Sequence, residues 1–411
     1  MFFLYNILTY VSIFFLQIIA LFNKKINFFV QGRKESFTIL EEKIKPSDKV
    51  FWVHVASLGE YEQGLPLMEQ LKSKFPTHKI VLTFFSPSGY EVKKNNSIAD
   101  ATLYLPMDTL ANAKQFLKQV HPEKAFFVKY EYWPNYLNQL RKKNIPTYLV
   151  SGILRSDQVF FKWYGGFYRK ALQAFTYFFV QNDISKQLLN QLNFTQVEVV
   201  GDTRFDRVSQ ILENNNKLDF LDEFTNNKQT KTIVIGSSWP EDEKFITTYI
   251  NNNTDSSLRF VFAPHNIKTE QIAQLQNSLK KPTILHSQHQ GKNLSEYNVY
   301  IIDAYSLLTK AYSYADIAYI GGGFGAGIHN ILEAATFGVP VVIGPKYKKF
   351  QEAKDLVALG SCLVVNNQEE LNDTFDKLLT DTTTKEKLGA ISSHFILKNK
   401  EATKKIMKHI S

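Results

Sequence analysis

Residues 320–333 read Ile-Gly-Gly-Gly-Phe-Gly-Ala-Gly-Ile-His-Asn-Ile-Leu-Glu, and an apolar run, Ile317–Ile320, leads into them. This pattern predicts a strand, a glycine-rich turn and then a helix. Glycines let a ligand approach the backbone, and a helix start offers N–H donors and positive potential to a phosphate. Glu333, expected one turn into the helix on the same face as His329, can accept hydrogen bonds from ribose hydroxyls. The stretch therefore predicts a nucleotide site that includes Gly327, His329, Asn330 and Glu333.

The residues around the glycines narrow the kind of nucleotide site. No Gly-Lys-Ser/Thr sequence follows them, so the stretch is not a Walker phosphate loop. Its likeness to a dinucleotide fingerprint is loose, because it comes late in its block instead of at the first strand–helix turn. A late glycine-rich loop with a glutamate in the following helix is typical of two-domain nucleotide-sugar transferases.

A second candidate segment, Gly236-Ser237-Ser238-Trp239-Pro240-Glu241, follows the apolar run Thr232–Ile235. Serine hydroxyls and unpaired N–H groups at a helix start suit a phosphate. Ser238 and Glu241 also have the spacing of an ordinary capping box, with Pro240 early in the helix. Phosphate contact by Gly236, Ser237 and Ser238 and a simple helix cap both stay open on this segment alone.

An acidic candidate stands in the first half of the chain, in Val53-His54-Val55-Ala56-Ser57-Leu58-Gly59-Glu60. A strand ends here, a glycine permits a tight turn, and Glu60 stands where the next helix begins. Ligands of open α/β sheets bind beyond the carboxyl ends of the strands, where a carboxylate could take a proton from an attacking hydroxyl. The alternative is a glutamate that only stabilises a helix N-terminus.

A similar junction occurs in Phe126-Phe127-Val128-Lys129-Tyr130-Glu131-Tyr132-Trp133-Pro134-Asn135. Lys129 and Glu131 could position a polar substrate, and Trp133 could stack on a sugar. The competing interpretation is that Trp133 and Pro134 only begin a helix.

The rest of the chain alternates short apolar runs with amphipathic stretches, which predicts parallel sheets with crossover helices. We expect an α/β fold class: two Rossmann-like domains facing a cleft, preceded by an N-terminal membrane-anchor helix. The expected divisions are an anchor over residues 1–23, a first domain over 24–212, a polar linker over 213–231 and a second domain over 232–411. Whether the last helix packs back on the first domain stays open.

The N-terminus and the net charge both point to a membrane. Residues 1–23 contain no charged side chain and are long enough to cross a bilayer as a helix, and Lys24 and Lys25 come directly after them. The positive-inside rule places the N-terminus outside and the chain after Lys24 in the cytoplasm, and whether the helix spans the bilayer or only inserts into it stays open. The net charge is +9 without any Lys/Arg-rich block, which favours an anionic membrane or substrate over nucleic acid. The one cysteine, Cys362, lies in an apolar run and is expected in the core.

Taken together, these segments resemble the bacterial family that transfers Kdo (3-deoxy-D-manno-octulosonic acid), and the resemblance runs almost from end to end. Eight features occur in the family's order, each weak alone. They are the apolar N-terminus with Gly32-Arg33-Lys34, Ala56–Glu60, Ser86–Gly89, Tyr104–Asp108, Glu131–Asn135, Gly201-Asp202-Thr203-Arg204-Phe205-Asp206, Gly236–Ser238 and Gly327–Glu333.

The resemblance implies a B-type glycosyltransferase fold and an inverting transfer of Kdo from CMP-Kdo to a lipid A precursor, lipid IVA. It implies no metal and no cofactor, and a place on the cytoplasmic leaflet of the inner membrane. Glu60 becomes the general base, and Ser57, Gly59, Lys129 and Glu131 become acceptor-site residues. The implied donor site consists of Arg204, Gly236, Ser237, Ser238, Gly327, His329, Asn330 and Glu333.

Three positions depart from the family pattern. Asp202 and Arg204 stand where the family usually has Asn and Lys, and Ala334 replaces a proline that often follows the glutamate. Two alternatives to a Kdo transferase are kept open. One is another membrane-peripheral nucleotide-sugar transferase or an epimerase, and the other is a non-catalytic, membrane-tethered nucleotide-binding protein.

Overall fold

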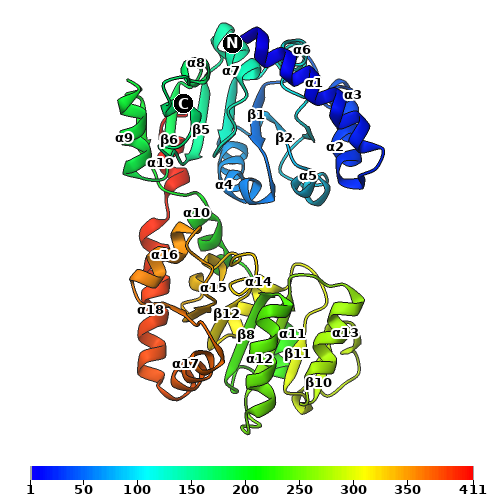
Figure 1. Cartoon of the computed structure of the whole chain (residues 1–411), viewed down its shortest axis with the longest axis vertical. Coiled ribbons are helices and arrows are strands. Elements are labelled where there is room, and N and C mark those ends of the chain that lie inside the picture. Colours follow the sequence, from blue (N-terminus) through cyan, green and yellow to red (C-terminus); the bar gives the residue numbers. More distant parts are fainter. Residues whose placement is uncertain (1, 411) are drawn as a thin grey trace. The chain divides into compact units, whose positions relative to one another are not determined.

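The computed structural model describes residues 2–410, which form two compact units. The first unit comprises Met1–Arg207 together with Lys400–Ser411, and the second comprises Val208–Asn399. Met1 and Ser411, the first residue of the expected anchor and the last of the expected second domain, lie outside the described residues. Each unit is built on its own parallel sheet (Figure 1).

Within residues 2–410, the first unit contains a sheet of seven strands in the order β3-β2-β1-β4-β5-β6-β7. Every adjacent pair in it is parallel. The strands are β1 (Val50–Val55), β2 (Lys79–Phe84), β3 (Ala101–Tyr104), β4 (Lys124–Val128), β5 (Thr147–Gly152), β6 (Tyr177–Val180) and β7 (Val197–Val199). Most of their residues are buried, as expected for a parallel sheet that is covered on both faces.

Helices cover both faces of this sheet because side chains alternate along each strand. Val50 and Trp52 of β1 belong to one apolar cluster, and Phe51, Val53 and Val55 belong to the other. The helices are α1 (Phe2–Ala20), α2 (Lys24–Lys34), α3 (Ser36–Lys43), α4 (Leu58–Lys74), α5 (Pro87–Lys93), α6 (Leu110–Val120), α7 (Pro134–Lys142), α8 (Gly166–Leu172), α9 (Asp183–Gln191) and α19 (Ala402–Lys408), with a 3-10 turn, η1, at Val159–Phe161.

The C-terminal helix α19 is part of the first unit. Ala402, Ile406 and Met407 are buried in the same apolar cluster as Leu67 and Met68 of α4. The side chain of Asp206 accepts hydrogen bonds from the backbone and hydroxyl of Thr403, each at 2.6 Å. The chain therefore passes twice between the units, through α10 (Arg204–Ser209) and after α18 (Thr382–Asn399).

The second unit repeats the architecture, with the strand order β10-β11-β9-β8-β12-β13-β14 among the described residues. All of its adjacent pairs are parallel as well. The strands are β8 (Thr232–Ser238), β9 (Arg259–Pro264), β10 (Thr283–Leu285), β11 (Val299–Ile301), β12 (Ile317–Ile320), β13 (Val341–Ile343) and β14 (Cys362–Val364). Cys362 is buried in β14, as its apolar surroundings predicted.

The helices of the second unit begin inside the segment that was expected to be a linker. Residues 213–231 include a short helix, α11 (Asp219–Phe224), whose Leu221 and Phe224 are fully buried, so this segment belongs to the second unit. The other helices are α12 (Pro240–Asn252), α13 (Thr269–Ser278), α14 (Leu308–Ala311), α15 (Leu332–Thr336), α16 (Gln351–Ala358), α17 (Gln368–Thr380) and α18. The 3-10 turns are η2 (Gln210–Glu213), η3 (His286–Gln288), η4 (Leu294–Glu296) and η5 (Tyr312–Tyr314).

Each sheet has one topological switch point, where the strand order turns back on itself. In the first unit this point lies between β1 and β4, and in the second between β8 and β12. Loops on either side of a switch point diverge, and the crevice between them is where open α/β sheets bind ligands. Ligand-binding residues are therefore expected in the four segments that come directly after β1, β4, β8 and β12.

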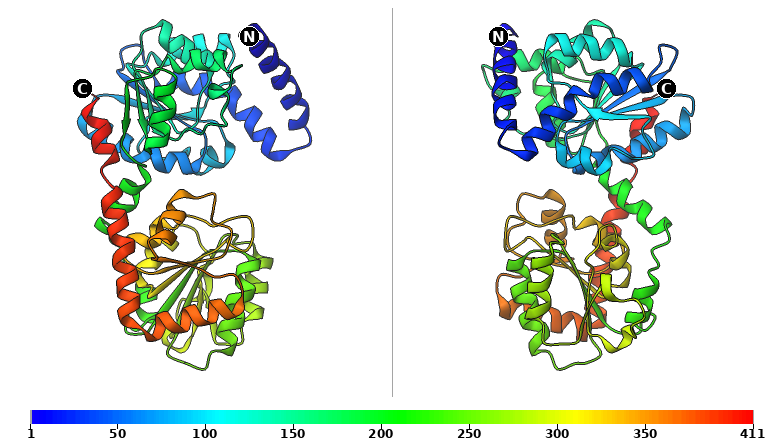
Figure 2. Two further views of the ribbon diagram at one scale, coloured as in Figure 1. Left: turned by 60° about the vertical axis from the view of Figure 1, so that its left-hand side comes forward. Right: turned by 90° about the vertical axis from the view of Figure 1, so that its right-hand side faces the viewer.

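Helix α1 is, among residues 2–410, the one helix long and apolar enough to cross a membrane by length and composition. It forms a hairpin with α2 and runs along the outside of the first unit (Figure 2).

Candidate functional site

Glu60 lies at the switch point of the first sheet, in the first turn of α4. Its side chain is 7% exposed, and its carboxylate accepts a hydrogen bond from the backbone N–H of Ala56. Burial, reinforced by the negative charge of Glu131, raises the pKa of Glu60 to about 7. Glu60 therefore stabilises the helix start, as the structural alternative supposed, and is also poised to exchange a proton near neutral pH.

Glu131, which follows β4, is held by a buried polar network. Its Oε2 accepts a hydrogen bond from the indole N–H of Trp133 at 2.8 Å and lies 3.1 Å from Nε2 of His54. His54 is fully buried, and its Nδ1 lies 3.2 Å from the carbonyl of Thr83, which can only accept. Nδ1 also lies 2.8 Å from the hydroxyl of Thr83, and the network fixes the position of Glu131. Trp133 is the N-cap of α7 and packs on Phe85, as the helix-start interpretation supposed.

Lys129 also stands at this switch point, in an unusual backbone conformation. Its φ angle is +68°, a left-handed conformation that a residue with a side chain rarely adopts. Its positive charge opposes the rise in the pKa of Glu60, which places the two side chains within electrostatic range. Ser57 is the N-cap of α4, and Gly59 is its second residue. The structure thus brings Ser57, Gly59, Glu60, Lys129 and Glu131 to one crevice of the first sheet.

Arg204 belongs to the first unit, whereas the other predicted donor residues all belong to the second. Its guanidinium pairs with the carboxylate of Asp202 at 2.8 Å, and Asp202 also accepts a hydrogen bond from Gln63 of α4. The charges of both Arg204 and Glu60 act on the hydroxyl of Tyr130. Arg204 is therefore grouped with the Glu60 crevice within its unit.

At the switch point of the second sheet, three rings form a stack. His265 packs on Trp239 with 4.7 Å between ring centroids and on His329 with 4.3 Å. The indole Nε1 of Trp239 donates a hydrogen bond to Nε2 of His329 at 2.9 Å. Burial, together with the neighbouring His265, lowers the pKa of His329 to about 4. His329 is thus neutral at physiological pH, with its hydrogen on Nδ1 available for a ligand.

Ser237 is the strained residue of this crevice. Its φ angle is +53°, and the register between β8 and β9 shifts at this point. Gly236 precedes it, and a Cβ atom there would come within 1.8 Å of the buried Tyr312 hydroxyl. Such strain in a residue that is not glycine is typical of ligand sites. The hydroxyl of Ser238, by contrast, donates to Glu243 at 2.7 Å, within the first turn of α12.

The helix cap at this junction differs from the predicted one. Trp239, and not Ser238, is the N-cap of α12, and the side chain of Asp242 accepts its backbone N–H at 3.1 Å. Pro240 occupies the first turn, as predicted. The capping box expected at Ser238 and Glu241 therefore lies one residue too early in the chain.

Asp242 also changes the predicted role of the glycines. Its carboxylate accepts the backbone N–H of Gly322 at 2.7 Å, so this amide is already occupied by a negative side chain. Gly322 has a φ angle of +92°, and a Cβ atom on Gly321 would come within 2.5 Å of Ser238 Cα. These glycines serve a tight turn and the close packing of β12 against β8. The backbone N–H of Gly322 is therefore not free to donate to a ligand.

The helix after the glycines begins later than the sequence suggested. Residues 328–331 form no helix, and α15 starts at Leu332, so His329 and Glu333 do not share a helical face. Instead Glu333 is held by two hydrogen bonds, from Thr309 Oγ1 at 2.5 Å and from Asn330 Nδ2 at 2.9 Å. Each carboxylate oxygen keeps acceptor capacity for a further donor, such as a ribose hydroxyl.

Two features of the second crevice escaped the sequence analysis. His265 directly follows β9, and the signal for it was a histidine after an apolar strand. A basic loop with Lys346, Lys348 and Lys349 follows β13, the neighbour of β12. This loop is tied to the glycine turn, because the backbone N–H of Lys346 donates to the carbonyl of Gly323 at 2.9 Å. The Lys346 loop supplies positive charge, whereas the short helix α15 contains no Lys or Arg.

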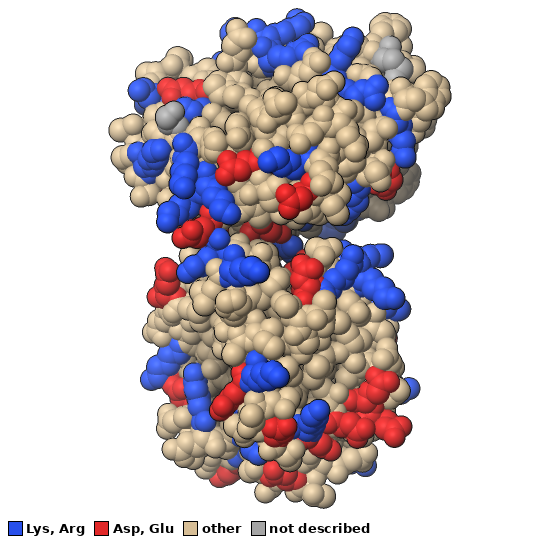
Figure 3. Space-filling model, turned by 90° about the vertical axis from the view of Figure 1, so that its left-hand side faces the viewer, with Lys and Arg blue, Asp and Glu red and all other residues tan. Residues whose placement is uncertain are grey.

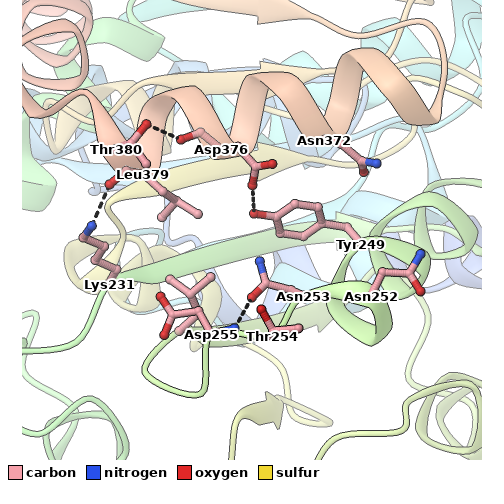
Figure 4. A pocket seen from close by; sticks show the side chains of 11 residues that line it. Lys231, Tyr249, Asn252, Asn253, Thr254, Asp255, Asn372, Asp376, Leu379 and Thr380 are labelled. Carbon is pink, nitrogen blue, oxygen red and sulfur yellow. Dashed lines mark hydrogen bonds between the residues drawn. The ribbon is translucent and has the colours of Figure 1, made fainter.

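A separate polar cavity of about 420 Å³ lies at the other end of the second sheet (Figure 4). Lys231 and Leu258, which line it, come immediately before β8 and β9. The cavity is bridged by a hydrogen bond from Tyr249 to Asp376 at 2.7 Å. It therefore lies at the amino ends of the strands and contains none of the switch-point residues. Among residues 2–410, no group of three or more His, Cys, Asp or Glu side chains could hold a metal ion.

The fold and its two switch-point crevices define the class of protein. Over 85% of its length the chain resembles UDP-GlcNAc 2-epimerase from Neisseria meningitidis, with 17% identity, a TM-score of 0.58 and 99% of that chain covered. Over 88% of its length it resembles MurG from Acinetobacter baumannii, with 14% identity, a TM-score of 0.53 and 99% of that chain covered. These likenesses show the fold, the two-domain B-type glycosyltransferase fold, as predicted.

The sequence comparisons show which family the chain resembles. Residues 31–207 match the family described as 3-deoxy-D-manno-octulosonic-acid transferase (kdotransferase). The chain is 28% identical to the 3-deoxy-D-manno-octulosonic acid transferase of Rickettsia bellii over 86% of this chain and 84% of that protein. It is 25% identical to the enzyme of the same name from Chlamydia trachomatis over 85% of this chain and 83% of that protein. The predicted resemblance to the Kdo transferase family is therefore confirmed.

Proposed function

We propose that this protein is an inverting glycosyltransferase that moves Kdo from CMP-Kdo onto lipid IVA, the lipid A precursor, at the cytoplasmic face of the inner membrane. The observation that carries the proposal is the placement of the two predicted residue groups. The Glu60 group lies at the switch point of the first sheet, and the His329 group lies at that of the second. Similarity to the Kdo transferase family supports Kdo as the transferred sugar.

The first unit would supply the base and the acceptor contacts. An inverting displacement needs a group that takes the proton of the attacking hydroxyl, and Glu60, with a pKa of about 7, is matched to that task. Burial and the negative charge of Glu131 keep the pKa of Glu60 raised, and Lys129 supplies positive charge for the phosphates of an acceptor lipid. The hydroxyl oxygen attacks the anomeric carbon, its proton passes to Glu60, and CMP leaves with the bonding electrons.

The second unit would hold the donor. Neutral His329 can donate its Nδ1–H, Ser237 offers its hydroxyl, and Glu333 can accept ribose hydroxyls. The phosphate of CMP and the carboxylate of Kdo are both anionic, and the Lys346 loop supplies charge of the opposite sign. Preorganised donors of this kind stabilise the departing phosphate.

A membrane location fits the distribution of charge. Of the 48 Lys and Arg residues in the chain, 30 belong to the first unit and 18 to the second. Of the 39 Asp and Glu residues, 18 belong to the first unit and 21 to the second. The unit that carries the apolar helix α1 therefore holds the whole basic surplus, and Lys and Arg are spread widely over the face of it drawn in Figure 3. Such a surface suits anionic lipid and a phosphorylated acceptor.

The test is a transfer assay with a defined product. Purified protein is incubated with CMP-Kdo, generated in place, and a tetraacylated lipid A precursor, and the lipid is analysed by mass spectrometry. The proposal requires a mass increase of one or more Kdo units and the release of CMP. A lipid of unchanged mass, with CMP-Kdo bound but not consumed, would support a non-catalytic nucleotide-binding protein instead.

A further inference from the structure

Helix α1 contacts the body of the first unit near its start and contacts α2 near its end. Its partly or fully buried residues recur every three or four positions and lie on one face; they are Phe2, Tyr5, Asn6, Thr9, Ile13, Leu16 and Ala20. This face also carries half of the polar side chains of the helix, those of Tyr5, Asn6 and Thr9. The exposed residues of the helix are mainly apolar, with Tyr10, Ser12 and Gln17 as the polar ones.

Specific contacts hold both ends of α1. Near its start, the Tyr5 hydroxyl donates to Asp108 Oδ2 at 2.6 Å, and the side-chain amide of Asn135 donates to Asn6 at 3.2 Å. The ring of Phe167 in α8 lies 5.7 Å from that of Phe2. At its other end Ala20 is buried, and its carbonyl accepts a hydrogen bond from an asparagine of α2. The 19 residues of α1 extend for about 28 Å. If only one end of the helix stayed with the unit, the contacts at the other end would be broken.

A membrane span would therefore carry polar parts of the unit into the hydrocarbon. Asp108 and Asn135 would enter the bilayer with Tyr5 and Asn6, as would Arg141 and Lys170, which line a small cavity together with Phe2. Each ionised side chain costs several kcal/mol at the bilayer centre. Basic residues flank α1 at both ends, with Lys24 and Lys25 at the far end, whereas a span is expected to have them on one side.

A second exposed apolar group lies beside the start of α1. Trp163 is 91% exposed and Tyr164 is 53% exposed, and they occupy the turn between η1 and α8. The turn is followed by Phe167, which touches Phe2 and Tyr5 of α1. Lys162 and Lys170 flank these aromatic side chains. Amphipathic rings with neighbouring basic residues are typical of the membrane–water interface.

From this geometry, and resting on the proposed membrane location, we infer that α1 lies in the plane of an anionic lipid surface instead of crossing it. Its outward face, with Phe3 and Phe14 at 79% and 59% exposure, inserts among the acyl chains, as does Phe22, which is 86% exposed in the turn after the helix. Trp163 and Tyr164 form a second contact with the same leaflet. Both ends of the helix and the whole first unit stay on one side of the bilayer.

The test measures the depth of α1 in vesicles. Single cysteines replace Phe3, Val11 or Phe22, which are all exposed, and carry the fluorophore NBD; buried Cys362 is not expected to react, and the wild-type chain checks this. Protein is added to preformed phosphatidylglycerol–phosphatidylethanolamine vesicles. In-plane binding predicts that 5-doxyl lipid quenches all three labels more than 12-doxyl lipid, and that external dithionite reduces the labels at positions 3 and 22 alike. Stronger quenching of position 11 by 12-doxyl lipid, with position 3 protected from dithionite, would overturn the inference.

The second contact is tested by vesicle sedimentation. Trp163→Ala should weaken binding to the same vesicles at least about fivefold, while Tyr305→Ala, which removes an aromatic ring that is 74% exposed in the second unit, leaves it unchanged. Equal loss in both variants, or none in Trp163→Ala, would contradict the second contact. Absence of vesicle binding by the wild-type chain would overturn the whole inference. Kdo transfer to a detergent-dispersed acceptor tests the proposed function separately, and Trp163→Ala should retain it.

Discussion

The indole N–H of Trp239 donates to Nε2 of His329 at 2.9 Å, and this hydrogen bond sets which ring nitrogen of the histidine faces a ligand as a donor. Trp239→Phe keeps an aromatic ring in the stack but removes the N–H. We expect CMP to bind about tenfold more weakly, because His329 loses its fixed orientation and a partly buried acceptor is left unpaired. Isothermal titration calorimetry with CMP measures the change.

The matched control for this variant is Trp133→Phe. Trp133→Phe also removes an indole N–H, but this one donates to Glu131 in the first unit. The indole N–H lost in Trp239→Phe donates to His329 in the second unit. CMP affinity should stay within about twofold of the wild-type value. If Trp239→Phe also leaves CMP affinity unchanged, His329 does not contact the nucleotide in the way we propose.

Replacement of the proposed base, Glu60→Gln, keeps the size and hydrogen-bonding capacity of the side chain but removes its basicity. The rate of Kdo transfer should fall at least about a hundredfold, the usual lower scale for the loss of a general base. CMP affinity should stay unchanged because Glu60 belongs to the first unit. Single-turnover transfer measured by mass spectrometry gives the rate, and a fully active variant would remove Glu60 from the mechanism.

The sequence predicted the parts of this site that depend on neighbouring residues along the chain. Apolar runs predicted the strands, and a polar residue soon after a run, such as Glu60 or Ser237, marked the carboxyl end of a strand. Features that depend on distant segments were not predictable: Asp242 reaches Gly322 from 80 residues away, and His265 stacks on His329 only because β9 and β12 both flank β8. The start of α15 was misplaced because glycine-rich loops carry no hydrophobic periodicity.

The pH dependence of transfer follows from the raised pKa of Glu60. The ionised form is the active base, so the rate should rise with pH below about 7 and level off above it. Glu131→Gln removes the negative charge that helps to raise this pKa, and the midpoint should move to lower pH. Transfer rates measured between pH 5 and 9, in roughly half-unit steps, test both statements. A midpoint that moves upward in Glu131→Gln would contradict the assignment of this limb to Glu60.

The same pKa makes a prediction for folding stability. Glu60 binds its proton more tightly in the folded protein than in the unfolded chain, where its pKa is near 4.5. Its contribution is therefore fully present below about pH 4.5 and is lost as pH rises through about 7. At pH 8, Glu60→Gln should have a free energy of unfolding on the order of 1–3 kcal/mol above that of the wild type, with little difference at pH 4.5. Urea unfolding at the two pH values measures the difference.

Ser237 offers a test of whether backbone strain is retained for ligand binding. Its φ angle of +53° costs a residue with a side chain about 1–2 kcal/mol, and glycine adopts this conformation freely. After the entropy that glycine loses on folding, Ser237→Gly should still stabilise the second unit by about 0.5–1 kcal/mol. The variant also loses the hydroxyl proposed to contact the donor, so the KM for CMP-Kdo should rise about tenfold. The neighbouring Ser238→Gly should behave in the opposite way, because the Ser238 hydroxyl already donates to Glu243 at 2.7 Å, within the first turn of α12. It should destabilise the protein by about 1 kcal/mol with little change in KM, and identical behaviour of the two variants would show that the strain at position 237 has no part in binding.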